Sequence, residues 1–378
     1  MRIGIDATPA VGDRGGVGWH VYNLLKALLD LKAGDLELLA YLKPGGRRRL
    51  PAEMINWEQP GRLRWVEAGR ATLRWRGTLD QLDLYHGPNF KMRTLGQFGG
   101  VVTIHDLWLD RHPEFSHKLF GQRASFRRTR RTALSANRVI TVSKYSAQDI
   151  ELLYGVPRER INVIYNGVSE EFRPIDDRDG LAVLREQYGI PTQRYLLFVG
   201  GADPRKNHQT LLRAYTRFCE VFPDHCLVLV GDVTHRFGDM RQTARTFGVE
   251  QRTICTGRLA ARDMRALYAY ADAFIFPSLY EGFGMPVLEA MACGTPVITS
   301  MTTSLPEVAG DAALLVKPDD VEGLADAIIA VLESPELRSS LQAKGLERVK
   351  LFTWERAARE TLAVYRMLCG TKEGEPAA

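Results

Sequence analysis

The feature that most constrains this chain is a regular alternation of short apolar runs with longer segments of helical periodicity. The runs predict strands at residues 2–6, 36–42, 83–87, 100–106, 138–143 and 161–167, and again at 195–200, 226–231, 273–277, 296–300 and 313–316. Short apolar strands that alternate with helices are typical of parallel sheets covered on both faces. Two such series predict an α/β chain with two doubly wound, Rossmann-like domains.

The break between the two series is the polar stretch 166–180, which contains one proline and two glycines and is typical of a linker. We place an N-terminal domain at residues 1–170 and a C-terminal domain at residues 171–352. Two such domains are expected to face each other across a cleft between the carboxyl edges of their sheets, where open α/β sheets bind ligands. Functional motifs should therefore lie directly after strands.

The charge of the chain is unevenly distributed. Its 378 residues have a net charge of +5, but residues 1–175 carry +9 and residues 176–378 carry −4, so the first half favours anionic partners. No apolar run reaches the roughly 18 residues of a membrane span, and the N-terminus is typical of a strand rather than a signal peptide. The five scattered cysteines favour neither disulfides nor zinc, which indicates a cytoplasmic protein.

The segment SLYEGFGMPVLEAMACGTPVITS, residues 278–300, carries two carboxylates, Glu281 and Glu289, on either side of a Gly-Phe-Gly turn. Glu289 falls in an otherwise apolar helix, and a buried carboxylate must find hydrogen-bond donors. Sugar hydroxyls are suitable donors, and the free N–H groups of residues 282–287 at the start of this helix favour a phosphate. The alternative is that Glu289 pairs with a buried arginine while Glu281 is a solvated loop residue.

The segment FVGGADPRKNHQTLL, residues 198–212, has a strand that ends at Gly201, after which Arg205, Lys206 and Asn207 precede a helix. Small residues let a ligand approach the backbone, and the two cations can neutralise a diphosphate. The Gly-Lys-Ser/Thr of a Walker A loop is missing. The alternative is that Asn207 only caps the helix and the cations are solvated.

Two further motifs follow strands of the first half. A glycine-rich loop that includes Gly16 opens a helix, but Val21 stands where a dinucleotide-binding GxGxxG motif has its last glycine. We expect this loop either to grip a ligand or to form a plain turn. His105 ends a strand expected near the centre of its sheet, a position that suits a functional or a structural histidine.

No metal site is expected. The eight histidines are dispersed and form no HExxH or paired motif. An Asp-x-Asp sequence occurs at residues 177–179, but it falls in the linker instead of after a strand.

The basic residues of the first half cluster in three segments. These are residues 45–50, 62–77 and 123–138, the last of which contains Arg127, Arg128, Arg130 and Arg131. Cations interleaved with Trp65, Trp75 and Phe126 suit an anionic membrane surface, and the alternative is a set of solvated helix faces. No nucleic-acid-binding module is visible, so no nucleic-acid partner is expected.

Taken together, these segments resemble the retaining glycosyltransferases of family 4, or glycosyl transferase group 1, and are similar to bacterial mannosyltransferases of surface polysaccharide assembly. The likeness covers nearly the whole chain. It is carried by GGVG (15–18), HDLW (105–108), YNGV (165–168), PRKN (204–207), PSLYEGFGMPVLEAMACGTPVITS (277–300) and SLPEVAGDAALLVKPDD (304–320). The family implies the GT-B fold, with a last helix at residues 353–371 that crosses back to the N-terminal domain.

The resemblance also implies roles for charged side chains. Glu289 would hold the ribose hydroxyls of the donor nucleotide, and Glu281 a hydroxyl of the donor sugar. Arg205 and Lys206 would neutralise the diphosphate, and His105 would touch the transferred sugar.

The remaining donor contacts would come from backbone and loop positions. They are Gly16 at the phosphates, the amides of Gly282, Phe283, Gly284 and Met285, and Arg258 with Leu259 along the nucleobase. Many family members have an arginine where this chain has Gly201. One phosphate contact is then missing, or Arg205 replaces it.

The expected activity is transfer of a hexosyl group from a nucleotide-sugar to a hydroxyl of a saccharide or lipid-linked saccharide, with the anomeric configuration retained. GDP-mannose is favoured as the donor over UDP-sugars, and no cofactor or metal ion is required. The alternatives are an epimerase or phosphorylase of the same fold, and a nucleotide-sugar sensor without catalytic activity.

Overall fold

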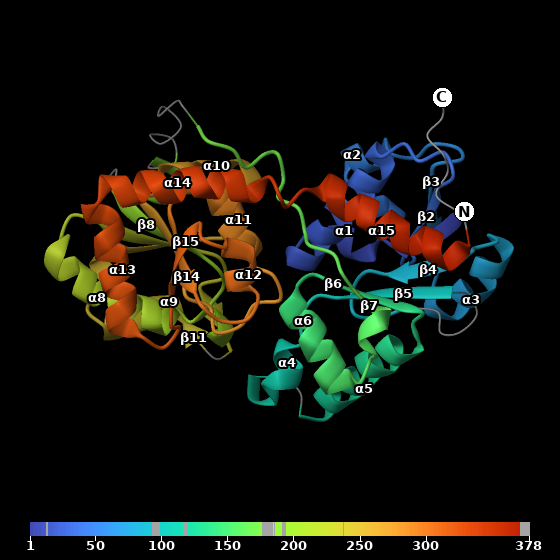
Figure 1. Cartoon of the computed structure of the whole chain (residues 1–378), viewed down its shortest axis with the longest axis horizontal. Coiled ribbons are helices and arrows are strands. Elements are labelled where there is room, and N and C mark those ends of the chain that lie inside the picture. The colour runs from blue at the N-terminus through green and yellow to red at the C-terminus, as the bar shows by residue number, and fades with distance from the viewer. Residues whose placement is uncertain are drawn as a thin grey trace. The chain divides into compact units, whose positions relative to one another are not determined.

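The computed structural model describes residues 1–12, 14–92, 99–115, 119–175, 184, 186–190, 194–236 and 238–370. The chain divides into two compact units (Figure 1). The first comprises Met1–Gly167 and the segment from Thr353, and the second comprises Val168–Phe352. The Asp-x-Asp sequence at 177–179 lies outside the described residues.

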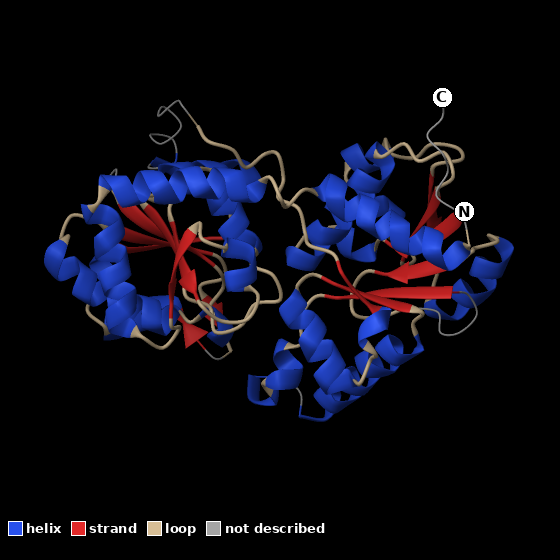
Figure 2. Ribbon diagram, viewed as in Figure 1, coloured by secondary structure: helices blue, strands red, loops and turns tan. Residues whose placement is uncertain are grey.

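The first unit is built on a parallel sheet of seven strands in the order β3-β2-β1-β4-β5-β6-β7. Figure 2 draws the strands in red among the blue helices. The strands are β1 (Arg2–Asp6), β2 (Glu37–Leu42), β3 (Leu63–Glu67), β4 (Leu84–Gly87), β5 (Gly99–Ile104), β6 (Arg138–Thr141) and β7 (Ile161–Val163). All except β3 fall on predicted strands. Their side chains are mostly buried, as expected where helices cover both faces of a sheet.

Strand β3 corrects the interpretation of residues 62–77 as part of an exposed basic surface. Leu63, Trp65 and Val66 are buried, whereas Arg64 on the same strand is exposed. The Trp65 indole N–H donates to the Met54 carbonyl at 3.2 Å, so the one polar atom of this ring is satisfied inside the core. Trp65 is therefore a core residue and is not available to a membrane.

The helices of the first unit include one from the C-terminal part of the sequence. They are α1 (Gly16–Asp30), α2 (Ala52–Ile55), α3 (Arg70–Leu79), α4 (Trp108–Arg111), α5 (Leu119–Ser135), α6 (Lys144–Asp149) and α15 (Trp354–Cys369). The buried residues of α15, among them Ala358, Leu362 and Tyr365, recur at helical spacing, and the helix packs against α1. Its start is capped by the Thr353 hydroxyl, which accepts from the Arg356 N–H at 3.1 Å.

The second unit is built on a parallel sheet of six strands in the order β12-β9-β8-β13-β14-β15. The strands are β8 (Tyr195–Val199), β9 (Cys226–Val230), β12 (Thr253–Gly257), β13 (Ala273–Phe276), β14 (Val297–Ser300) and β15 (Ala313–Val316), with a short antiparallel pair β10 (Thr234–His235) and β11 (Gly238–Asp239) outside the sheet. Of the six sheet strands, β12 is the one that the sequence pattern does not predict. Its five residues are all half-buried, because it lies at the edge of the sheet and lacks a fully apolar run.

The strand order of the second unit creates a switch point at its centre. The chain runs outward from β8 to β9 and β12 on one side, and from β13 to β14 and β15 on the other. Ligands of open α/β sheets bind at the carboxyl ends of the strands at such a point. The loops that follow β8 and β13 are the segments placed there.

Helices complete the second unit, and Figure 1 shows them around its sheet. They are α8 (His208–Val221), α9 (Met240–Thr246), α10 (Ala261–Tyr270), α11 (Met285–Ala292), α12 (Leu305–Ala309), α13 (Val321–Glu333) and α14 (Pro335–Val349). Helix α11 packs against α10, α12 and α14, which explains why it is apolar on most sides. Both units thus have the predicted doubly wound α/β architecture.

Candidate functional site

The switch point of the second unit brings together a lysine and a glutamate that lie far apart in the sequence. Lys206 ends a short 3₁₀ turn, residues Pro204–Lys206, after β8, and Glu281 lies in the loop after β13. The Lys206 Nζ is 2.7 Å from the Glu281 Oε1, and the Arg205 Nη1 is 4.0 Å from the Glu281 Oε2. Two cations therefore share one carboxylate at the carboxyl edge of the sheet.

Asn207 joins the two loops, and its side chain makes no capping bond to α8, so the alternative that it only caps this helix is wrong. Its backbone is left-handed, with φ of +57°, a conformation that asparagine tolerates better than most residues. Its amide nitrogen donates to the carbonyls of Pro277, at 3.0 Å, and Pro318. The Leu279 N–H adds a bond to the Arg205 carbonyl at 2.7 Å. These bonds hold the cations after β8 against the loop after β13.

Burial excludes the alternative in which these charges are merely solvated. The side chains of Lys206 and Glu281 are 14% and 8% exposed. Burial alone would raise the pKa of Glu281, but the charges of Lys206 and Arg205 outweigh it and hold that pKa below its usual range. Burial also lowers the pKa of Lys206, against the opposing charge of Glu281. The pair is a buried salt bridge that depends on both partners.

The loop between the two candidate carboxylates is shaped by glycine and by hydroxyl groups. Gly284 has φ of +111°, and a Cβ there would lie 2.7 Å from the Leu305 side chain, so only glycine fits. The Ser304 hydroxyl lies 2.9 Å from the Glu281 carbonyl and 2.8 Å from the Phe283 carbonyl, to which it donates. The loop leads into α11 at Met285, where helix-start N–H groups favour an anion.

Glu289 lies on α11 and is only partly exposed. The Tyr268 hydroxyl donates to its Oε2 at 2.9 Å, and no ion pair joins it to an arginine or lysine in the part of the chain that the structure describes. The alternative of a buried arginine partner is therefore wrong for these residues. Burial raises the pKa of Glu289 to about 7, although the Tyr268 bond and the charge of Lys206 oppose that rise.

The other predicted donor residues of the second unit lie along the same edge of the sheet. Arg258 follows β12 and forms an ion pair with Asp232, which follows β9, with Nη2 and Oδ2 2.7 Å apart. Leu259, the next residue, is half-buried. A Cβ at Gly201 would meet only ordinary contacts, the nearest being the Asp232 carbonyl at 3.6 Å. Packing therefore does not require glycine at position 201.

The predicted residues of the first unit also lie after strands. His105 follows β5 and is buried, and its Nε2–H donates to the Pro88 carbonyl at 2.9 Å. Burial lowers its pKa, so the ring is neutral and its Nδ1 is an acceptor. Gly16 opens α1, and a Cβ there would meet nothing within 4 Å, which leaves the backbone accessible.

His105 belongs to a cluster of three buried histidines with His20 and His86, which the sequence does not indicate. The ring of His20, on α1, contacts that of His105 edge-on, with centroids 4.6 Å apart. The His20 Nδ1–H donates to Asn166 at 2.8 Å, and His86 bonds Tyr365 and Thr103 at 2.6 and 2.8 Å. Burial lowers the pKa of His86 to about 3, so these rings act as neutral packing and hydrogen-bonding groups.

Four basic residues of α5, Arg127, Arg128, Arg130 and Arg131, are exposed, as the sequence predicts. Arg127, Arg130 and Arg131 line an open hollow of about 650 Å³ together with Phe126 and Leu134. Trp75, on α3, is 75% exposed. None of the described helices combines the length and the apolar character that crossing a bilayer requires.

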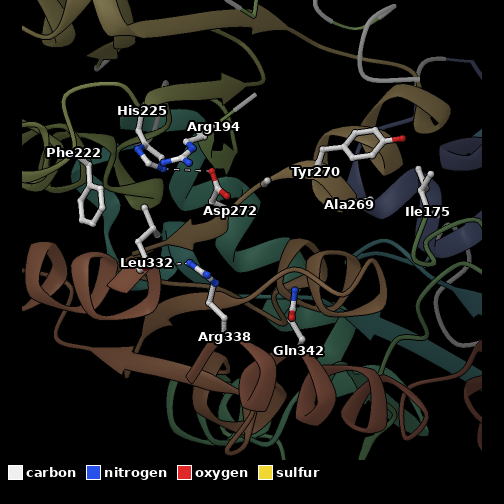
Figure 3. Close-up of a pocket in the computed structure, with 11 residues that line it drawn as sticks. Ile175, Arg194, Phe222, His225, Ala269, Tyr270, Asp272, Leu332, Arg338 and Gln342 are labelled. Carbon is white, nitrogen blue, oxygen red and sulfur yellow. Dashed lines mark hydrogen bonds and ion pairs between the residues drawn. The ribbon is translucent and has the colours of Figure 1, made fainter. Parts of the chain in front are cut away.

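A hollow of about 690 Å³ in the second unit is not the candidate site (Figure 3). Arg194 and Asp272, which line it, immediately precede β8 and β13, so it opens at the amino ends of the strands. The His225 Nε2 lies 3.5 Å from the Asp272 Oδ2 and ties two of its walls together. No predicted donor residue lines this hollow, and the parallel sheet places the candidate site at the opposite edge.

No group of three or more His, Cys, Asp or Glu side chains suited to holding a metal ion is found over the described ranges. Lys206, Arg205 and the start of α11 are the positive groups near Glu281. The arrangement can hold an anion at the carboxyl edge, and Glu281 and Glu289 can accept hydrogen bonds from hydroxyl groups.

Comparison with known proteins agrees with this fold. The profile of glycosyl transferases group 1 matches residues 182–348, and that of glycosyltransferase family 4 matches residues 14–172. The chain is 35% identical to O-antigen chain mannosyltransferase B of Escherichia coli, over 90% of this chain and 85% of that protein.

Two solved structures have the same fold. Sucrose-phosphate synthase from Thermosynechococcus elongatus has a TM-score of 0.77 at 23% identity, covering 98% of this chain and 100% of the other. Anabaena HepE in complex with UDP-glucose has a TM-score of 0.73 at 20% identity, covering 96% and 100%. With two parallel α/β sheets of the GT-B kind, and a relative this similar over nearly its whole length, the chain belongs to the group 1 glycosyltransferases of family 4.

Proposed function

We propose that this glycosyltransferase moves a hexosyl group, with mannose favoured, from a nucleoside diphosphate sugar to a hydroxyl of a saccharide or lipid-linked saccharide, with retention of the anomeric configuration. The observation that carries the proposal is the buried cluster of Lys206, Arg205 and Glu281 at the switch point, beside the start of α11. It combines cations for a diphosphate with a carboxylate for sugar hydroxyls.

In this proposal Lys206 and Arg205 stabilise the diphosphate as its bond to the sugar breaks. Negative charge grows on the leaving phosphate while the sugar becomes cationic, and cations held in a buried site stabilise that charge more strongly than they do in water. The amides of Gly282, Phe283, Gly284 and Met285 add donors at the helix start. Because these groups supply positive charge, the proposal needs no metal ion.

Glu281 and Glu289 are proposed to hold hydroxyl groups of the donor. Glu281 is buried and kept ionised by its two cations, so it is a strong acceptor for a sugar hydroxyl. Glu289 has one oxygen bound by Tyr268, and its other oxygen is assigned to the ribose. His105 of the first unit is proposed to contact the transferred sugar through its acceptor Nδ1, and Gly16 to approach the phosphates.

Retention is proposed to follow same-face attack, in which a phosphate oxygen of the leaving group accepts the proton of the acceptor hydroxyl. This route needs no nucleophile from the protein. It does need a diphosphate held firmly beside the anomeric carbon, and Lys206 and Arg205 are proposed to hold it. Arg205 is also proposed to replace the phosphate contact for which Gly201 has no side chain.

The donor is proposed to be GDP-mannose, because the Escherichia coli relative is a mannosyltransferase. A UDP-sugar is the second candidate, supported by the UDP-glucose in the Anabaena HepE structure. Arg258 and Leu259 are proposed to lie along the nucleobase, where they would bear on this choice.

The acceptor is proposed to reach the enzyme at the inner face of the cytoplasmic membrane. The exposed Arg127, Arg128, Arg130 and Arg131 on α5 would contact anionic headgroups, with the adjacent Phe126 and Leu134 as apolar neighbours. The protein is therefore proposed to be cytoplasmic and to bind the membrane peripherally.

The experiment that tests this function is to incubate the chain with GDP-mannose or UDP-glucose and a mannoside acceptor, and to follow the products by proton NMR. The proposal requires release of nucleoside diphosphate in proportion to a new α-linked glycoside. A non-catalytic sensor would bind the nucleotide-sugar and leave it intact, and an inverting enzyme would yield the β-glycoside.

A further inference from the structure

Tyr268 is a buried residue with a polar group aimed at the candidate donor site. It lies on α10, its side chain is completely buried, and its hydroxyl donates to the Glu289 Oε2 at 2.9 Å. Neither the sequence motifs nor the family resemblance assigns it a role. A buried tyrosine hydroxyl needs one partner to offset its desolvation, and for Tyr268 that partner is the carboxylate assigned to the ribose.

The tyrosine ring is held from several sides. Phe274, on β13, packs edge-on against it with centroids 5.3 Å apart, and Phe172 does so at 5.9 Å. The Tyr268 carbonyl accepts from the Thr295 hydroxyl at 2.6 Å. Because packing holds the ring and a hydrogen bond holds the backbone, the Tyr268 hydroxyl is a fixed donor for the Glu289 carboxylate.

The bond from Tyr268 to the Glu289 Oε2 leaves the Oε1 atom available to a ligand. A carboxylate has two oxygens and about four lone-pair positions, and Tyr268 occupies one of those on Oε2. Glu289 is partly exposed, and Oε1 has no hydrogen-bond or ion-pair partner among the described residues. Two neighbouring hydroxyls, as on a ribose, match the acceptor positions of a carboxylate held in one orientation.

We propose that Tyr268 is a positioning residue for the nucleotide, whose hydroxyl fixes the Glu289 carboxylate so that the free oxygen meets the ribose hydroxyls. The inference rests on the proposed donor site, and it adds selection of ribose over deoxyribose to that site.

Within the described ranges, three groups bear on the charge of Glu289. Tyr268 donates from α10, the Lys206 ammonium acts from the turn after β8, and the Cys293 thiol lies directly after α11. The Lys206 Nζ forms an ion pair with Glu281 at 2.7 Å, so the Glu281 carboxylate offsets most of the lysine charge. The Tyr268 bond is thus the direct contact that favours the ionised form of Glu289, and its loss would raise the pKa of Glu289 further.

The test is a calorimetric titration of the whole chain with GDP, 2′-deoxy-GDP, UDP and 2′-deoxy-UDP from pH 5.5 to 8.5. The variants are Tyr268→Phe and Glu289→Gln. Tyr270→Phe, on the same helix but lining the hollow at the amino ends of the strands, is the matched control.

For the nucleotide that binds, we expect Tyr268→Phe to weaken affinity by about tenfold at pH 7, as for a hydrogen bond to a charged group. The preference for ribose over 2′-deoxyribose should fall by a similar factor, and the pH at which affinity is half-maximal should rise. Tyr270→Phe should match the wild type in all three. Melting temperatures of all variants separate these effects from loss of the fold.

The outcomes distinguish this inference from the function on which it rests. If Glu289→Gln abolishes the ribose preference while Tyr268→Phe keeps it unchanged, Tyr268 has only a structural role and the inference is wrong. If neither variant changes affinity or preference, the nucleotide does not bind at Glu289 and the proposed donor site is wrong. If Tyr268→Phe does not fold, a wild-type protein without preference for ribose still overturns the inference.

Discussion

Replacing Lys206 by methionine should destabilise the second unit more than removing the whole charge pair. The Glu281 side chain is 8% exposed and its main partner is the Lys206 Nζ at 2.7 Å. Deletion of one member of a buried ion pair costs about 3–5 kcal/mol, because the other charge remains buried without compensation. Arg205 still lies 4.0 Å from the carboxylate, which favours the lower end of that range, about 3 kcal/mol.

The assay is differential scanning calorimetry of the wild type, Lys206→Met and the double variant Lys206→Met/Glu281→Gln. For a unit of this size, 3 kcal/mol corresponds to a decrease in melting temperature of about 6–12 °C. The double variant should recover most of that loss, because a neutral methionine and glutamine no longer bury an unpaired charge.

The pH dependence of the stability of the same variants gives an independent check on the direction of the Glu281 pKa shift. In the wild type Glu281 has a lowered pKa, so its stabilising contribution is present above its unfolded pKa and is lost in acid. Without Lys206, burial dominates and the pKa of Glu281 should rise. Lys206→Met should then gain stability relative to the wild type as the pH falls from 7.5 to 5.

Two results would refute this reasoning. One is a double variant as unstable as Lys206→Met, which would mean that the lysine contributes by packing and not by compensating Glu281. The other is a single variant as stable as the wild type at pH 7.5, which would mean that Glu281 is hydrated in solution.

Three further outcomes are expected. Glu289→Gln should raise the melting temperature by about 5 °C at pH 8 and not at pH 5. The reason is that the raised pKa of Glu289, about 7, makes its ionisation in the folded protein costly only at the higher pH. An equal gain at both pH values would contradict this. His105→Ala should lower kcat by about a hundredfold with little change in donor affinity, if it contacts the sugar mainly in the transition state; an unchanged kcat in steady-state assays counts against that role. Reversing Arg127, Arg128 and Arg131 to glutamate should weaken binding to phosphatidylserine vesicles at least a hundredfold in sedimentation assays, while equal binding would exclude this surface.

The fold could be predicted where burial forces a continuous apolar run. Central strands such as β8 and β13 are covered on both faces and show this pattern, whereas β12 lies at an edge with half-buried residues and does not. The sequence pattern does not predict strand β3, because its exposed Arg64 and buried Trp65 resemble a basic, aromatic surface when the pairing with β2 is unknown. A strand at the edge of a sheet, or one of mixed polar and apolar composition, thus lacks the continuous apolar run on which the prediction depends.

The candidate site could be predicted where a charge lies in an apolar setting. Glu281 and Lys206 stand out because a charge at the end of a buried strand demands a partner, and the structure pairs them. Tyr268 gives no such signal, since a tyrosine in an amphipathic helix is more often core, and only its distance to Glu289 shows its second role. The tie that Asn207 makes to Pro277 depends on the order of strands in the sheet, which a single sequence does not specify.

The measurement that tests the central claim most directly is a titration of the purified chain with GDP-, UDP-, ADP- and dTDP-sugars, followed by its melting temperature and repeated with Glu289→Ala. A ligand that binds the native state must raise the melting temperature. The proposed donor site predicts that sugars of one nucleotide class stabilise the wild type and that Glu289→Ala loses most of that stabilisation. Stabilisation by none of them, or equal stabilisation of both proteins, would contradict a nucleotide-sugar site at Glu289.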